Sequence, residues 1–159
     1  MRKVVFLISV ILIFTMAFSA GISVLGGMEL SGKSRQFVGA RLTFLNSFLG
    51  LDVDVYTPVS SFGSSAEELQ NVKFVEIDPY LLLNLPLGDF KVYAGAAPII
   101  IADIENVDFK LFSMNVFHAK AGLTYGKGIT FFVDGITTFT TKFESTGIYS
   151  VSAGIGLGF

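Results

Sequence analysis

The residues of this chain that could carry out chemistry are a single histidine and two pairs of acidic residues. His118 is the only histidine, and an imidazole can act as a general base because its pKa lies near neutrality. Asp52 with Asp54, and Glu76 with Asp78, repeat at a spacing of two residues. Clustered carboxylates can bind a cation or form an aspartyl catalytic group. The chain contains no cysteine, so disulfides and thiolate metal sites are excluded.

Ion pairing inside the protein is the alternative explanation for these acidic residues. Residues two apart in a strand point to the same face, and the basic residues Arg41, Lys91 and Lys120 occur at matching positions in other segments. Buried charges must be paired. We therefore expect the acids to be interior counter-charges, and His118 to be an interior histidine with satisfied hydrogen bonds. On this interpretation the chain has no catalytic, cofactor-binding or metal-binding residues.

These residues lie on segments in which apolar side chains alternate with polar or small ones. A period of two is the signature of a β-strand. In one such segment Phe117, Ala119 and Ala121 alternate with His118 and Lys120. No charged residue falls on the apolar face of any segment. The sequence therefore predicts eight strands, at about 21–31, 36–45, 48–59, 74–87, 90–104, 116–125, 129–142 and 147–159.

The composition is unusually apolar for a chain without a long hydrophobic helix. Hydrophobic residues make up 52% of the 159 residues, while charged residues still reach 15%. After residue 20 no apolar run approaches the roughly 20 residues that a membrane helix needs. The apolar side chains are therefore distributed along the strands rather than concentrated in one segment.

The N-terminal residues have the pattern of a secretory signal peptide. Two basic residues precede an apolar run over 4–18, and small residues follow it. The alternative is an N-terminal anchor helix, but the apolar run is short for one. We therefore expect a signal peptide over 1–20, cleaved after Ser19 or Ala20. Loss of the two basic residues would change the formal net charge from −2 to −4. A negative net charge argues against a nucleic-acid partner.

Alternation alone leaves open which face of the sheet lies inside. A soluble lipid carrier has its apolar face inside, whereas a membrane barrel has it outside. The polar face carries too few charges for a surface in contact with water, so we expect the membrane arrangement. Aromatic residues of the apolar face also lie near the strand ends, as in interfacial girdles. They are Phe44, Phe90, Tyr125, Phe131 and Phe159 near the short connections, and Phe139, Phe143 and Tyr149 towards the long ones.

The predicted fold is an all-β, eight-stranded, antiparallel up-and-down transmembrane barrel over 21–159. Tight turns are expected at 46–47, 88–89 and 126–128, and longer external loops at about 60–73 and 105–116. An eight-stranded barrel is just wide enough for side chains to fill it, so we expect a packed polar interior. Pro79 and Pro98 would face each other and lack ladder donors, which predicts a bulge or local break there.

The turn lengths predict two interior ion pairs. A two-residue turn at 46–47 would place Arg41 opposite Asp52, and a three-residue turn at 126–128 would place Lys120 opposite Asp134. The remaining members of the expected interior network are Glu29, Asp54, Glu76, Asp78 and Lys91.

The last residues resemble the C-terminal signal of bacterial outer-membrane β-barrels, with Ser152, Gly154, Leu157 and a terminal Phe159 at the matching positions. Residues 21–159 are similar in architecture to the small eight-stranded barrels of the OmpA and OmpX type. This resemblance implies an outer-membrane location after signal-dependent secretion, contact with membrane lipid, and recognition by the barrel-assembly machinery. It also implies a monomer with a structural or surface-interaction role and no cofactor.

Two other functions remain open from the sequence. The first is a soluble lipocalin-like carrier of an apolar ligand. The second is a lipid-modifying outer-membrane enzyme, since some barrels of the deacylase type carry a His-x-Ser motif on the lipid face. Here the corresponding residues are His118, Ala119 and Lys120, and the alternation directs His118 inward. The sequence therefore favours a protein that is not an enzyme.

Overall fold

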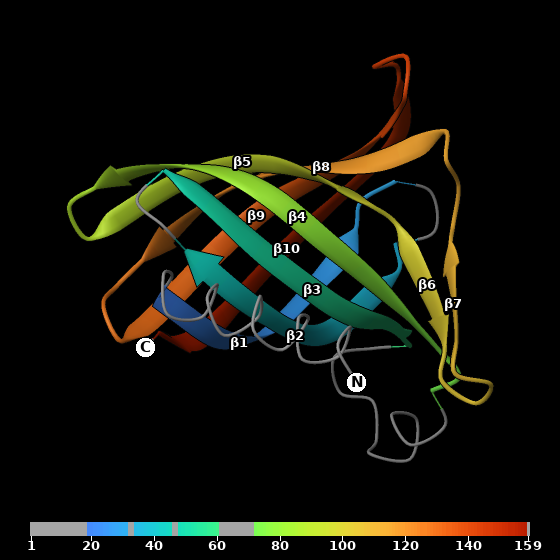
Figure 1. Ribbon diagram of the computed structural model, residues 1–159, viewed down its shortest axis with the longest axis horizontal. Helices are drawn as coiled ribbons and strands as arrows, with labels where there is room; N and C mark the ends of the chain where they lie inside the picture. Colours follow the sequence, from blue (N-terminus) through green and yellow to red (C-terminus); the bar gives the residue numbers. More distant parts are fainter. Residues whose placement is uncertain (1–18, 32–33, 46–47, 61–71, 159) are drawn as a thin grey trace, which may run out of the picture.

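The computed structural model describes residues 19–31, 34–45, 48–60 and 72–158. Within them no helix is long and apolar enough to cross a membrane. All the paired strands are antiparallel and form one sheet that closes on itself between β10 and β1 (Figure 1). The strands are β1 (Ser19–Glu29), β2 (Gln36–Leu45), β3 (Leu49–Val59), β4 (Phe74–Leu87), β5 (Phe90–Pro98), β6 (Ile100–Asp103), β7 (Asp108–Leu111), β8 (Val116–Tyr125), β9 (Ile129–Thr140) and β10 (Ser145–Gly158).

Eight of these strands make the barrel wall, in the order β1, β2, β3, β4, β5, β8, β9, β10. Figure 1 shows the β4–β5 and β8–β9 turns at the same end as the C-terminus, which we name the tight-turn end. The β6–β7 and β9–β10 hairpins project from the opposite end, the loop end. The expected two-residue turn at 88–89 is confirmed, because Leu87 pairs directly with Phe90. The expected signal peptide lies mostly in residues 1–18, outside the described residues.

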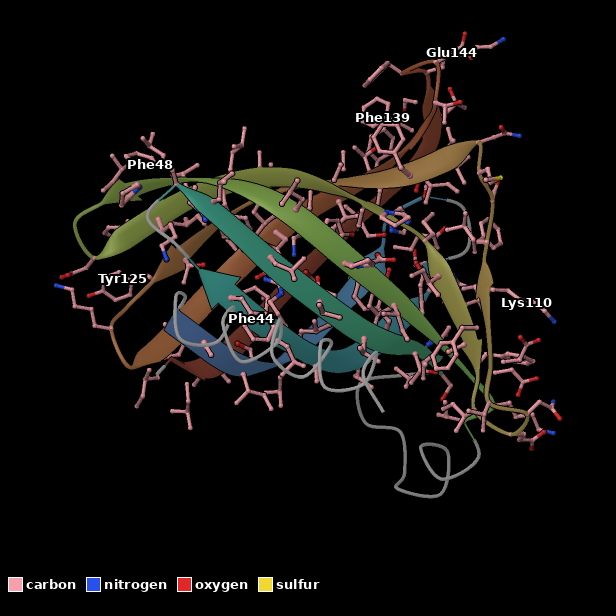
Figure 2. All side chains as sticks on the ribbon, viewed as in Figure 1. Phe44, Phe48, Lys110, Tyr125, Phe139 and Glu144 are labelled. Carbon is pink, nitrogen blue, oxygen red and sulfur yellow. The ribbon has the colours of Figure 1, made fainter. Side chains whose placement is uncertain are left out.

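The apolar face of the barrel is its outer face. On β4, the outward residues Leu81 and Leu83 are 66% and 68% exposed. Asp78 and Tyr80, on the opposite face of the same strand, are fully buried. Aromatic rings lie at both ends of the outer face, with Tyr125 at the tight-turn end and Phe139 at the loop end (Figure 2). This is the membrane arrangement and the reverse of the soluble carrier.

The predicted register between β2 and β3 is wrong by two residues. Arg41 lies opposite Asp54, not Asp52, and the last recorded pair before the connection is Leu45 with Gly50. Four residues therefore separate the paired positions, where a two-residue turn at 46–47 was expected. Residues 46–47 themselves lie outside the described residues.

The predicted register between β8 and β9 is wrong by the same amount. Lys120 lies opposite Ile136, and Asp134 lies opposite Gly122. The pairing stops at Tyr125 with Phe131, so the connection is longer than the three residues expected. A shift of two residues leaves every side chain on its original face, so the charges still point inward although neither predicted pair lies directly opposite. Arg41 remains within ion-pair distance of Asp52, at 3.5 Å, whereas Lys120 pairs with Asp52 and Asp54 and not with Asp134.

The predicted break between the two opposed prolines is confirmed. Pairing of β4 with β5 stops at Leu81 and resumes with β6 at Ile77 in the same register, so it is a break without a bulge. Pro79 and Pro98 lie within this interval. The expected strand 90–104 is accordingly divided into β5 and β6.

The segment 105–116, expected to be a loop, contains strand β7 and forms a hairpin with β6. Asp103 closes its turn by accepting hydrogen bonds from the backbone N–H groups of Glu105 and Asn106. The pKa of the Asp103 carboxyl lies below its usual range, chiefly because the Asn106 side-chain amide donates a hydrogen bond to it. The two backbone hydrogen bonds lower it further. The other expected loop, 60–73, falls mostly on 61–71, outside the described residues.

Candidate functional site

Five charged side chains meet at mid-depth in the barrel and form what we name the central charge layer: Arg41, Asp52, Asp54, Lys120 and Asp134. Each is at most 3% exposed. The Arg41 guanidinium donates to both Asp54 oxygens, at 2.6 and 2.8 Å, and to Asp134 Oδ2 at 2.5 Å. Lys120 Nζ lies 2.9 Å from Asp52 Oδ2 and 3.1 Å from Asp54 Oδ2. These charges come from β2, β3, β8 and β9, so their contacts cross the barrel interior.

The partners in the central charge layer differ in part from those that the sequence predicted. Arg41 was expected to pair with Asp52 and pairs chiefly with Asp54 and Asp134, although its Nε remains 3.5 Å from Asp52. Lys120 was expected to pair with Asp134 and instead contacts Asp52 and Asp54. Two basic and three acidic groups leave the layer with one formal negative charge. Buried ions are tolerated only when they are paired and hydrogen-bonded in this way.

Aromatic side chains complete the central charge layer. Tyr93 donates a hydrogen bond to Asp134 Oδ1. The Arg41 Cζ lies 3.9 Å from the centroid of the Phe132 ring, and Lys120 Nζ lies 4.0 Å from that of Tyr80, both within the range of cation–π contacts. Sequence reasoning did not assign these aromatic residues to the network. Their positions on the polar face of the alternating pattern could have predicted that these aromatic side chains point into the barrel.

Two other residues expected in the network lie apart from the central charge layer. Glu29 lies near the loop end, where its carboxylate is 3.7 Å from the Arg35 guanidinium. Lys91 is half-buried near the tight-turn end, and among the described residues no ion pair is recorded for it. The expected single network is therefore divided along the barrel axis.

A second group, which we name the loop-end cluster, consists of Glu76, Asp78 and His118 with the hydroxyls of Tyr56 and Tyr80. His118 Nδ1 lies 2.7 Å from Asp78 Oδ2 and 3.6 Å from Glu76 Oε1. Tyr56 Oη lies 2.6 Å from Glu76 Oε1 and 2.8 Å from Asp78 Oδ2. The sequence predicted that His118 points inward. It did not predict contact with Glu76 and Asp78, because these acids are on β4, which does not pair with β8.

Two cavities flank the central charge layer. The tight-turn cavity, of about 380 Å³, is lined by residues that include Ser23, Thr43, Asn84, Lys91 and Thr124. The loop-end cavity, of about 390 Å³, is lined by residues that include Glu29, Arg35, Tyr56, Glu76 and His118. On β8, the buried Lys120 lies between His118, which lines one cavity, and Thr124, which lines the other. The buried charges therefore separate the two cavities.

The sequence matches no protein-family model and no curated protein. In structure it is similar to the N-terminal β-barrel domain of Pseudomonas aeruginosa OprF, with 16% identity and a TM-score of 0.58 over 89% of this chain and 97% of that one. The fold is that of a small eight-stranded outer-membrane β-barrel. A de novo designed transmembrane β-barrel is also similar, with 16% identity and a TM-score of 0.54 over 89% of this chain and 95% of that one. These similarities concern the fold alone, and they confirm the predicted fold class.

Proposed function

We propose that this chain is an integral outer-membrane β-barrel protein with a structural or surface-interaction role, and that it is not an enzyme. The observation that carries the proposal is the apolar outer face. On β4 alone, the outward residues Leu81, Leu83, Leu85 and Leu87 are each more than half exposed. Such a continuous apolar surface is unfavourable in water and favourable against lipid.

The barrel wall supports this assignment. Every strand of the eight-stranded wall pairs with two neighbours, so the wall is closed. Among the described strands, β7 of the loop-end hairpin pairs with β6 alone. The outer aromatic rings pair at both ends, with Phe90 and Tyr125 centroids 4.7 Å apart at one end and Phe117 and Phe139 centroids 5.9 Å apart at the other. Paired aromatic rings at these two levels suit the two interfaces of a bilayer.

The environment of His118 supports a role without catalysis. A lipid-modifying enzyme of the barrel type would need a histidine free to act beside a surface open to lipid. Here His118 lines the loop-end cavity inside the barrel and not the lipid-facing surface. On our proposal the protein is secreted with its signal peptide, assembled by the barrel-assembly machinery, and present as a monomer whose loop end faces outside the cell.

Cell fractionation with a heat-modifiability gel tests this proposal. We expect the protein in the membrane fraction, released only by detergent, with the unheated sample migrating differently from the boiled one. A protein that remains soluble without detergent and shows no shift on boiling would contradict the membrane assignment and favour the soluble carrier. A change in the lipid A of cells that express the protein, lost in a His118→Gln variant, would favour the enzyme.

A further inference from the structure

We propose that Glu76, Asp78 and His118 bind a divalent transition-metal cation, Zn²⁺ or one of similar chemistry, in the loop-end half of the barrel. Two of these residues come from β4 and the third from β8, so only the closed barrel brings them together. One imidazole and two carboxylates are a ligand set that suits Zn²⁺ and neighbouring divalent ions.

The distances among the ligand atoms fit one metal ion. The three residues offer ligand atoms that all lie within 4.8 Å of one another. Bonds of about 2.0–2.2 Å at tetrahedral or octahedral angles separate neighbouring ligand atoms by about 2.8–3.6 Å. The observed separations of His118 Nδ1 from Asp78 Oδ2 and Glu76 Oε1, 2.7 and 3.6 Å, bracket that range. The ligand atoms of the two carboxylates lie within the same 4.8 Å limit, so the three groups can share one ion.

Asp78 provides the independent sign that a ligand is missing. Its side chain is fully buried, yet Oδ1 has no hydrogen-bond partner among the residues that the structure describes. The other oxygen, Oδ2, is within hydrogen-bond distance of three groups, from Tyr56, Tyr80 and His118. Buried polar atoms are rarely left without a partner. A carboxylate can bind one cation through both of its oxygens, so an ion beside Oδ2 would also give Oδ1 a partner.

The surroundings contain the outer hydrogen bonds that metal ligands need. Tyr56 donates towards Glu76, and Tyr80 donates to Asp78 at 3.0 Å. Such bonds orient ligating carboxylates and strengthen metal binding. With these hydroxyls in place, the carboxylates are held towards the ring of His118.

Charge and access both favour a cation at this place. The basic residue lining the same cavity, Arg35, is engaged by Glu29, and Lys120 is engaged by the acids of the central charge layer. A histidine must be deprotonated to bind a metal, and the two carboxylates then carry two formal negative charges that a divalent ion would neutralise. Glu76 and His118 line the loop-end cavity of about 390 Å³, which gives an ion a place to enter.

Zn²⁺ binding to the full chain, purified in detergent and stripped of metal with EDTA, tests the proposal. Isothermal titration with ZnCl₂ should give one ion per chain, and CoCl₂ should give the visible absorption of a bound Co²⁺ ion. His118→Gln should weaken Zn²⁺ binding at least tenfold. The matched control is Ser150→Ala, because Ser150 lines the same cavity, carries no charge and is not a member of the triad, and its affinity should equal that of the parent protein.

The variants separate loss of the site from loss of the fold. Each is checked first for the heat-dependent gel shift of the folded barrel. If Asp78→Asn does not fold, because its side chain is buried, His118→Gln and Glu76→Gln still decide the matter. Absence of saturable Zn²⁺ binding up to about 1 mM, or equal affinity in His118→Gln and Ser150→Ala, would overturn the proposal.

Discussion

Replacement of Arg41 by glutamine should destabilise the barrel far more than the loss of an ion pair at its surface. Arg41 donates to Asp54 and Asp134 and lies 3.5 Å from Asp52, so it holds together all three carboxylates of the central charge layer. Without it, Lys120 is the one basic residue left in the layer. The formal charge of the layer then changes from −1 to −2 in a space where each side chain is at most 3% exposed.

The expected loss follows from leaving buried carboxylates without a partner. Removing one member of a buried ion pair costs about 3–5 kcal/mol of unfolding free energy. Arg41→Lys keeps the charge but cannot donate to both oxygens of Asp54, so it should lose about 1.5–3 kcal/mol, the contribution of a hydrogen bond to a charged group. Arg35→Gln breaks a pair at 3.7 Å in which the arginine is 60% exposed, and should cost less than about 1 kcal/mol.

Urea unfolding of the protein reconstituted in lipid vesicles measures these differences. The chain has no tryptophan, so the folded fraction is best read from the gel shift of unheated samples or from circular dichroism. The order of stability should be parent, Arg35→Gln, Arg41→Lys and then Arg41→Gln. If Arg41→Gln unfolds within about 1 kcal/mol of Arg35→Gln, the central charge layer does not stabilise the barrel in the way that its geometry implies.

Three further predictions concern the outer face, the inner face and assembly. Leu81→Arg, on the outer face, should lower the free energy of unfolding in lipid by about 2–4 kcal/mol, whereas Met114→Arg at the loop end should leave it almost unchanged. Equal urea midpoints for the two variants would contradict the lipid-facing assignment. Gly154→Ala would place a methyl group 2.4 Å from an interior phenylalanine ring and should lower the free energy of unfolding by about 1–3 kcal/mol. The control is Gly135→Ala, whose added methyl group would have its nearest neighbour 4.0 Å away, and it should unfold like the parent protein. Phe159→Asp, outside the described residues, should reduce insertion into the membrane in cells but leave refolding in detergent intact, and normal insertion would count against an assembly signal at the C-terminus.

Much of the fold follows from the sequence because alternation is a local property. A strand exposes successive side chains on opposite faces, so the identity of every second residue predicts both the strands and their two faces. The last strand illustrates this, since Tyr149, Ile155 and Leu157 point outward while Ser152 is buried inside. The two prolines likewise predict their own break in the ladder, because a proline has no N–H to donate.

The partners of the interior charges were decided only by the tertiary structure. A register shift of two residues preserves the faces, so no alternating pattern can distinguish Arg41 opposite Asp52 from Arg41 opposite Asp54. The length of the connection makes that choice, and both the β2–β3 and β8–β9 connections are longer than their sequences predicted.

Contacts across the barrel are even harder to predict from the sequence. His118 meets Asp78, which is 40 residues away and on a strand that does not pair with its own. Such a contact depends on how far each strand is tilted and staggered when the sheet closes, and no single strand carries that information. The sequence determined that acids, bases and one histidine would point inward, and the closure of the barrel decided which of them would meet.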